Sequence, residues 1–329
     1  MPRYLSRPAQ WVRRRWQRIR FGARAVILAY HRVGEPGQDP FELCVKPGTF
    51  AQHLEVVRRF GSVVRFDRLF ESLTASDAPV EQICITFDDG YADNLLVARP
   101  ILERYDVPAT VFVTTDHIDS DREFWWDELE RLVAESGPPY VLPPEFDESG
   151  GGAGVRVGSF EEAFRRAYDR LFGLHPDERE RLLDRLAGQR GRPVARATHR
   201  TLRSREIVAL ADGGLVEIGA HTVTHPPLDR LDVEAQRREI AASKSRLEEI
   251  PGAGVVSFAY PHGRYGRATP GIVAEAGFRQ ACTVHHSAVW QGTDPFLVPR
   301  IVVGEWDADE LARRLAWWLG RSPKRRRRA

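Results

Sequence analysis

The feature that most constrains the fold of this 329-residue chain is an alternation between short apolar runs and longer amphipathic stretches. The short runs are rich in β-branched residues, and such an alternation is typical of a parallel sheet with crossover helices. The expected strands are residues 25–30, 62–66, 82–87, 109–114, 215–219, 255–260, 278–284 and 297–303, and the main expected helices are residues 50–60, 94–105, 204–212, 233–249 and 309–319.

About eight strands in one series favour a closed or nearly closed barrel over an open sheet. No glycine-rich nucleotide or phosphate loop follows an expected strand. Between about 120 and 200 the alternation lapses, and amphipathic helical patterns take its place. The sequence therefore predicts an α/β fold, a distorted (β/α) barrel of seven to eight parallel strands, with a mostly helical insertion at about 120–200.

Charge is distributed unevenly along the chain. Residues 1–24 hold eight arginines and no acidic residue, and residues 321–328 add six basic residues. Subtracting these fourteen charges from the net charge of +2 leaves −12 for the middle of the chain. We therefore expect one acidic domain over residues 25–319, between a basic N-terminal arm (1–24) and a basic C-terminal tail (320–329), and no nucleic-acid partner for the domain.

The N-terminal arm lacks the continuous apolar stretch of a signal peptide, and no segment has the length of a transmembrane helix. We expect a protein of the cytoplasm or of the inner face of the membrane. A solvated arm is the simpler interpretation of residues 9–21. The alternative is a basic helix with Trp11, Trp16 and Phe21 that lies on an anionic membrane surface. The sequence does not indicate an oligomeric state.

Three clusters of polar residues follow expected strands. The first is residues 86–91, Thr-Phe-Asp-Asp-Gly-Tyr. Adjacent carboxylates at a strand end point in divergent directions, so one can bind a metal while the other faces a water. Asp-Asp-Gly is equally good turn chemistry, so this cluster alone leaves both interpretations open.

The second cluster is residues 219–225, Gly-Ala-His-Thr-Val-Thr-His. Histidines four residues apart, here His221 and His225, lie on one side of a helical turn, where two imidazoles can meet one cation. Thr222 stands where a metalloprotease helix has its glutamate, so a base must come from elsewhere. The acidic pair supplies both the missing ligand and the missing base.

The third cluster is residues 258–263, Phe-Ala-Tyr-Pro-His-Gly, again at a strand end. A loop with proline and glycine can expose a backbone N–H for a developing oxyanion, although a tight strand-exit turn has the same composition.

These clusters, in this order, resemble the motifs of the polysaccharide deacetylase family, also called the NodB-homology or carbohydrate esterase family 4 domain. The resemblance extends over roughly residues 26–303, and the insertion is its least similar part. Residues 30–33 (Tyr-His-Arg-Val) and 298–301 (Val-Pro-Arg-Ile) also resemble segments of exopolysaccharide-associated members.

The resemblance implies that Asp88 is the catalytic base and that Asp89, His221 and His225 bind one divalent metal. Zinc is the default ion, although members of the family accept others. It further implies an N-acetylated glycan as substrate, and an oxyanion held on the metal and on the backbone N–H of His262.

The chain departs from the family pattern in two places. Ala259 stands where many members have an arginine, and we expect Arg300 to orient Asp88 in its place through a charge-assisted hydrogen bond. The alternative for Arg300 is a surface arginine on an edge strand. A late histidine that often serves as general acid is absent after His286. The acid is then His285, His286, His31 or a water, and His31 is expected at the same rim as the metal.

The leading hypothesis is a metal-dependent hydrolase that removes N-acetyl groups from N-acetylhexosamine units of a polysaccharide or glycan precursor. An imide or amide hydrolase on the same site is one alternative, and a catalytically degenerate glycan-binding domain is another. Four tryptophans favour a sugar, because indole faces stack on pyranose rings, but they can equally be core residues: Trp125, Trp126, Trp290 and Trp306.

Overall fold

The computed structural model describes residues 23–35, 37–74, 81–146, 154–188, 191–250 and 254–320. Two units are distinguished by their internal contacts. The barrel unit comprises Met1–Glu35, Leu43–Ile118 and Leu202–Ala329, and the insertion unit comprises Pro36–Glu42 and Asp119–Thr201. Most of the predicted basic arm (1–22) and basic tail (321–329) lies outside the described residues.

The barrel unit is built on a curved, mostly parallel sheet with the strand order β11-β10-β9-β6-β5-β1-β12. β13 also pairs with β1, and β4 with β5, both in parallel, whereas β12 runs antiparallel to β1. The strands are β1 (Ala23–Tyr30), β4 (Ser62–Val63), β5 (Gln82–Phe87), β6 (Ala109–Val113), β9 (Val216–Ala220), β10 (Ser257–Ala259), β11 (Gln280–Cys282), β12 (Val289–Trp290) and β13 (Ile301–Val302), and the two-stranded ladder of β2 (Arg32–Val33) and β3 (Cys44–Val45) lies apart.

The two sides of this sheet meet through the chain that leads into β13. Cys282 of β11 forms a parallel bridge with Val298, and β13 follows three residues later beside β1. The backbone N–H of Val298 donates to the carbonyl of Ala281 at 3.0 Å. The predicted fold class, a distorted (β/α) barrel with a helical insertion, is thus confirmed.

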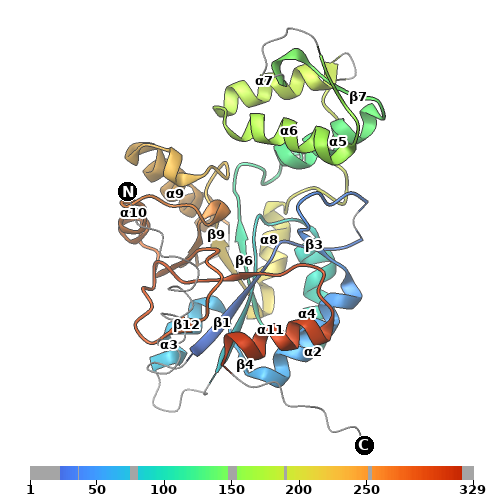
Figure 1. The fold of residues 1–329 in the computed structure, drawn as a ribbon. Coiled ribbons are helices and arrows are strands. Elements are labelled where there is room, and N and C mark those ends of the chain that lie inside the picture. Colours follow the sequence, from blue (N-terminus) through green and yellow to red (C-terminus); the bar gives the residue numbers. More distant parts are fainter. Residues whose placement is uncertain are drawn as a thin grey trace, which may run out of the picture. The chain divides into compact units, whose positions relative to one another are not determined.

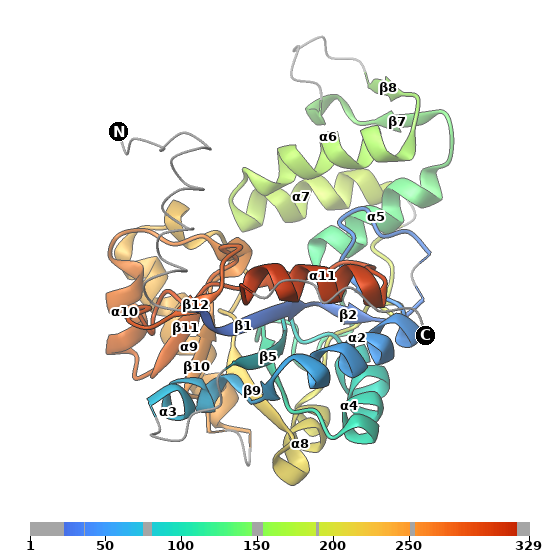
Figure 2. The same ribbon diagram turned by 60° about the horizontal axis from the view of Figure 1, so that its bottom comes forward.

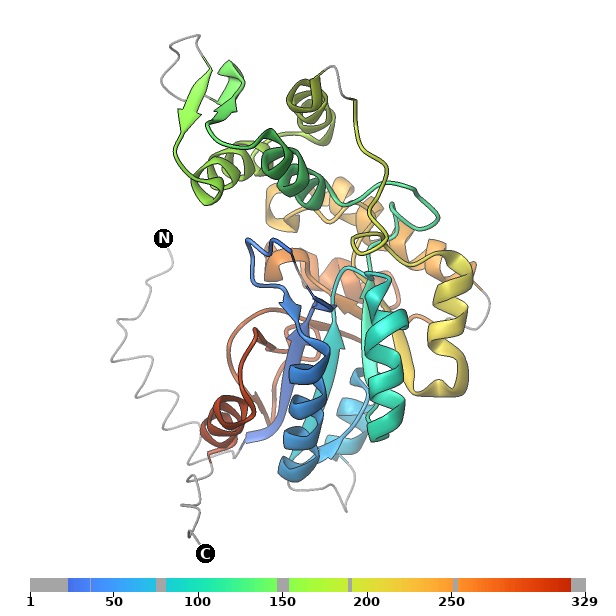
Figure 3. The ribbon, with the colours of Figure 1, turned by 90° about the vertical axis from the view of Figure 1, so that its right-hand side faces the viewer.

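Helices surround the strands (Figures 1 and 2). Figure 3 shows α2 in blue and α4 in teal side by side along the strands, and α11 packs on α2. The helices of the barrel unit are α2 (Pro47–Phe60), α3 (Leu69–Thr74), α4 (Arg99–Tyr105), α8 (Ser204–Ala211), α9 (Val233–Glu248), α10 (Thr269–Glu275) and α11 (Ala308–Trp318), with short 3-10 turns η1 (Phe66–Arg68), η5 (Asp212–Gly214), η6 (Leu228–Arg230) and η7 (Pro261–Gly263) and the π-helical turn η2 (Asn94–Ala98).

Side chains alternate between two hydrophobic layers, which explains why the strands are apolar on both faces. In β1, Ala25 and Ile27 belong to the layer inside the barrel, whereas Val26 and Leu28 belong to the larger layer beneath the helices. Because successive side chains of a strand point to opposite faces, a strand buried on both sides shows no polar alternation.

The insertion unit contains α5 (Trp125–Ser136), α6 (Phe160–Phe172) and α7 (Pro176–Ala187). It also contains an antiparallel ladder that the sequence pattern did not predict, formed by β7 (Tyr140–Leu142) and β8 (Val155–Val157), and the turn η3 (Pro144–Phe146). Trp125 stacks on Tyr168 with 5.0 Å between ring centroids, and Trp126 stacks on Phe124.

Two of the four tryptophans considered for sugar stacking are therefore core residues. Trp125 is 7% exposed and Trp126 6% exposed, and both pack inside the insertion unit. Trp290 and Trp306 are partly buried against the hydrophobic core, and the guanidinium of Arg314 lies 4.0 Å from the Trp306 ring centroid. The tryptophan content thus gives no argument for a sugar substrate.

Several predicted boundaries were wrong. The strand expected over 62–66 is limited to Ser62–Val63, and η1 begins at Phe66. The strand expected over 297–303 is limited to Ile301–Val302, preceded by the single bridge at Val298. None of the helices in the part of the chain that the structure describes combines the length and apolar character needed to span a bilayer.

Candidate metal centre

The first site segment leaves β5 at Asp88. The backbone N–H of Asp88 donates to the Tyr30 carbonyl at 3.0 Å, and the carbonyl of Asp89 accepts from the N–H of Thr114 at 3.2 Å. Asp89 and Gly90 both have positive φ, 72° and 79°. A Cβ on Gly90 would lie 3.0 Å from the Val113 side chain, so the turn requires glycine there. This backbone separates the two carboxylates.

The second site segment leaves β9 at His221. The His221 N–H donates to the Val113 carbonyl at 3.0 Å, which continues the ladder with β6. Thr222 and His225 then adopt left-handed backbone conformations, with φ of 66° and 57°. The expected helical turn between the histidines is thus wrong, because these residues form a loop. The loop nevertheless brings the two rings to a centroid distance of 4.8 Å.

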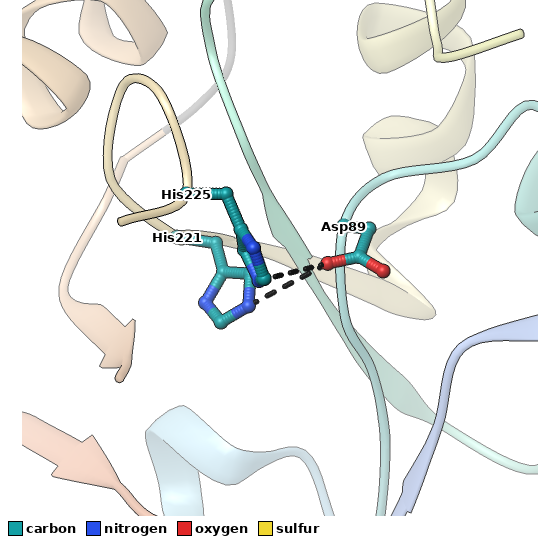
Figure 4. Close-up of side chains that lie close together, drawn as sticks. All are labelled: Asp89, His221 and His225. Atoms are coloured by element: carbon teal, nitrogen blue, oxygen red, sulfur yellow. Dashed lines mark ion pairs between the residues drawn. The ribbon is translucent and has the colours of Figure 1, made fainter. Parts of the chain in front are cut away.

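Asp89, His221 and His225 converge in the interior (Figure 4). One carboxylate oxygen of Asp89 lies 3.7 Å from Nε2 of His221 and 3.4 Å from Nε2 of His225. The three ligand atoms lie within 4.8 Å of one another, and all three residues are buried. One oxygen and two imidazole nitrogens are the donor set of many catalytic zinc sites, so these residues fit a divalent cation.

The hydrogen bonding of His221 supports that fit. Its Nδ1 lies 2.8 Å from the carbonyl oxygen of Ala259, which can only accept, so Nδ1 carries the proton. Burial lowers the pKa of His221 to about 4, although the negative charge of Asp88 acts in the opposite direction. The ring is therefore neutral at pH 7, and its Nε2 directs a lone pair towards Asp89, as a metal ligand requires.

Asp88 faces a buried arginine. Arg300 is fully buried, and it donates to the two carboxylate oxygens of Asp88 at 2.6 and 2.7 Å. It also donates to the Thr86 hydroxyl and the Thr283 carbonyl, each at 3.1 Å. Burial alone would raise the pKa of Asp88, but the charge and hydrogen bonds of Arg300 hold it at about 2. Asp88 is thus ionised at neutral pH, 4.0 Å from Nε2 of His221.

His262 follows β10 in the turn η7, with φ of 57°. The centroid of its ring lies 4.5 Å from the centroid of the His225 ring. Burial is the largest cause that lowers the pKa of His262 to about 4, and the charge of Arg264 acts in the same direction. Gly263 follows with φ of 65°, and a Cβ there would lie 2.2 Å from a methyl carbon of Val284. The tight loop places His262 beside the metal-ligand group.

His31 follows β1 and is partly buried. Its charge influences the pKa values of Asp88, His221 and His262, so its ring lies within electrostatic range of all three. Two other histidines considered as general acid, His285 and His286, are exposed.

A pair of residues that sequence reasoning missed holds the chain around His31. Asn94 is 1% exposed, and its Nδ2 donates to the His31 carbonyl at 2.9 Å. Asp93 accepts from Nε of Arg32 at 3.1 Å and from the N–H of Val33 at 3.3 Å. Both residues lie five or six positions after Asp88, at the start of η2, where no local pattern marks them. They connect the exit of β1 to the exit of β5.

Together these observations define the class of protein: a (β/α)-barrel protein with a buried Asp-His-His group and an ionised aspartate at the carboxyl ends of its strands. The family model for polysaccharide deacetylases matches residues 75–137 and 191–281. The unmatched part between these segments lies within the insertion unit.

YxkH of Bacillus subtilis, which is named for the same family, is 25% identical over 120 residues. That alignment covers 36% of this chain and 42% of YxkH, so the similarity spans about two fifths of that relative.

Solved structures share the fold at lower identity. The deacetylase PplD of Streptococcus pyogenes, determined with acetate, superposes with a TM-score of 0.56 at 20% identity and covers 89% of this chain and 99% of its own. IcaB of Ammonifex degensii has a TM-score of 0.57 at 19% identity, with 91% and 98% covered. BC0361 of Bacillus cereus, a polysaccharide deacetylase, has a TM-score of 0.58 at 17% identity, with 89% and 69% covered. Residues 75–137 and 191–281 thus carry the polysaccharide deacetylase domain that the family model describes.

Proposed function

We propose that this protein hydrolyses the N-acetyl groups of N-acetylhexosamine units in a polysaccharide or glycan precursor. The observation that carries the proposal is an ionised carboxylate, Asp88, placed beside the buried group of Asp89, His221 and His225. The match to the family model supports glycan deacetylation as the general activity.

Asp89, His221 and His225 would hold one divalent cation, for which zinc is the first candidate. When bound, such a cation supplies a Lewis acid for the acetamide carbonyl and makes water more acidic. Two loops supply the ligand set, and their ligand residues Asp89 and His225 have left-handed backbones. Such backbone strain usually accompanies a functional site.

In this proposal Asp88 accepts the proton of the attacking water. Arg300 occupies one side of the carboxylate with two hydrogen bonds, so the carboxylate has one fixed orientation. Each carboxylate oxygen has two lone pairs, so the oxygens can still accept from a water while they are bound by Arg300. The backbone N–H of His262, beside His225, would stabilise the developing oxyanion.

We assign protonation of the leaving amine to His31. Its electrostatic influence on Asp88, His221 and His262 supports this assignment, as does the exposure of His285 and His286. Asn94 and Asp93 hold the backbone on which His31 stands. A histidine can donate a proton near neutral pH, which the protonation of an amine at that pH requires.

The test is acetate release together with metal content. The purified chain is incubated with chitin oligomers, poly-N-acetylglucosamine and peptidoglycan, and free acetate is measured enzymatically. Asp88→Asn is the variant that tests the catalytic base, since it keeps the shape of the side chain. We expect acetate from at least one glycan, about one metal per chain, and a loss of ~10²-fold or more in Asp88→Asn.

Other results would select an alternative. Stoichiometric metal without acetate from any glycan favours an imide or amide hydrolase on the same residues. Absence of both favours a glycan-binding domain without catalysis. Acetate release that Asp88→Asn leaves unchanged removes Asp88 from the mechanism.

A further inference from the structure

The loop that carries the two histidines is held from outside by a glutamate on another element. Glu239 lies in α9, and one of its carboxylate oxygens accepts from the backbone N–H groups of Val223 at 2.8 Å and Thr224 at 2.9 Å. The other oxygen accepts from the Thr224 hydroxyl at 2.7 Å. Three hydrogen bonds thus connect one half-buried side chain to the residues between His221 and His225.

This loop has an unusual backbone. Thr222 and His225 both have left-handed φ values, and neither is a glycine. Such conformations persist in L-residues only when the surroundings hold them. The local bond from the His225 N–H to the Thr222 hydroxyl, at 3.1 Å, lies within the loop and does not attach it to another element.

Attachment comes from two opposite sides. The carbonyls of Thr222 and Val223 accept from the N–H groups of Thr115 and Asp116, at 3.2 and 2.9 Å, which joins the loop to the exit of β6. The N–H groups of Val223 and Thr224 point the other way, to Glu239. β6 and α9 therefore hold the loop between them, and a carboxylate is the side chain able to accept on both oxygens.

We infer that Glu239 is a positioning residue for the cation site. By holding Val223 and Thr224, it sets the distance at which Nε2 of His221 and of His225 face Asp89. The inference rests on the proposed function, because it takes these three residues as the ligands of a cation. Residues that orient metal ligands without touching the metal typically contribute 10–100-fold to its affinity.

Glu239→Met is the decisive variant. Methionine has a similar length, and its thioether sulfur is only a weak acceptor. The N–H groups of Val223 and Thr224 and the Thr224 hydroxyl therefore lose their partner. Glutamine is unsuitable, because its oxygen can accept from both N–H groups while its NH₂ group donates to the Thr224 hydroxyl. The matched control is Glu234→Met, the same change on the same helix, where the glutamate is exposed and 3.9 Å from Arg237.

The measurement is the affinity of each metal-free protein for Zn²⁺ alone, by competition with a chromophoric chelator at pH 7.5. We expect Glu239→Met to raise the Kd for Zn²⁺ by about 10–100-fold, and Glu234→Met to leave it unchanged. Saturating Zn²⁺ should restore acetate release in Glu239→Met, because the reacting groups remain in place. Asp88→Asn should gain nothing from added Zn²⁺.

A second variant keeps the test valid if Glu239→Met does not fold. Thr224→Val removes only the hydroxyl bond and should raise the Kd by a smaller factor. Wild-type affinity for Zn²⁺ in a folded Glu239→Met, or in Thr224→Val when that is the variant available, overturns the inference. A wild-type chain that binds no Zn²⁺ instead refutes the cation site itself, so the two failures are distinguishable.

Discussion

The contact between Arg300 and Asp88 leads to a stability prediction that does not depend on any substrate. Replacing Arg300 by methionine removes four hydrogen bonds and leaves the Asp88 carboxylate buried without its counter-charge. Both side chains are almost inaccessible, 0% and 4% exposed. Loss of one partner from a buried ion pair costs about 3–5 kcal/mol, so we expect a loss of that size in the free energy of unfolding.

The double variant sharpens the prediction. Asp88→Asn alone leaves the Arg300 charge buried without its counter-charge and should cost a similar amount, whereas Asp88→Asn with Arg300→Met leaves no buried charge at this position. The double variant should therefore be more stable than the sum of the two single changes predicts, by about 2–3 kcal/mol of coupling energy. Arg166→Met is the control, since its ion pair with Glu162 is exposed and should contribute about 0–1 kcal/mol.

The assay is urea denaturation of the metal-free proteins at pH 7, followed by the fluorescence of the eight tryptophans. Arg300→Met with a loss below about 1 kcal/mol would refute the reasoning, because such a value is typical of an exposed pair. Strict additivity of the two single changes would refute it equally, since it would show that the two charges do not interact.

Three further predictions concern the site and the barrel interior. His221→Ala and His225→Ala should each lose metal, measured by elemental analysis after dialysis, and wild-type zinc affinity in either would contradict the ligand set. His31→Gln should lower kcat for acetate release by ~10² while metal content stays unchanged; an unaltered kcat would exclude His31 as the acid. Burial, and secondarily Asp67, raise the pKa of Glu217 to about 7 from its ordinary 4.5. The folded state therefore favours the neutral acid. The stability that this neutral acid contributes is complete below pH 4.5 and is lost as the pH rises to about 7. The free energy of unfolding of Glu217→Gln, measured by urea denaturation and compared with that of the wild type, should thus rise by up to ~3 kcal/mol between pH 4.5 and 7. A constant difference across that range would contradict the buried, raised pKa.

Much of the fold is predictable because its causes are local. Residues 82–87 were predicted as a strand, and β5 has those bounds, since the run is rich in buried apolar residues and the Thr86 hydroxyl donates to the Leu28 carbonyl at 3.0 Å. The short strands were harder. β4 and β13 have two residues each, and a run of that length is determined by its neighbours in the sheet rather than by its own composition.

Among the site residues, too, some features have local causes and others depend on distant parts of the chain. Asp88 and Asp89 are adjacent in the sequence and follow a strand, so a pattern can mark them. The backbone between His221 and His225 was predicted as a helical turn, whereas Glu239 and β6 hold it in a loop. A spacing of four residues is compatible with both, and the choice depends on hydrogen bonds from distant elements.

The amino-acid sequence by itself determined the order of strands and helices and the positions of polar residues at strand ends, because backbone hydrogen bonding and burial impose short periods on neighbouring residues. Only the tertiary structure decided which of those polar residues meet. Arg300 reaches Asp88 across 212 positions, and Glu239 reaches the histidine loop from a separate helix. Such contacts depend on the curvature and register of the sheet, to which all its strands contribute together.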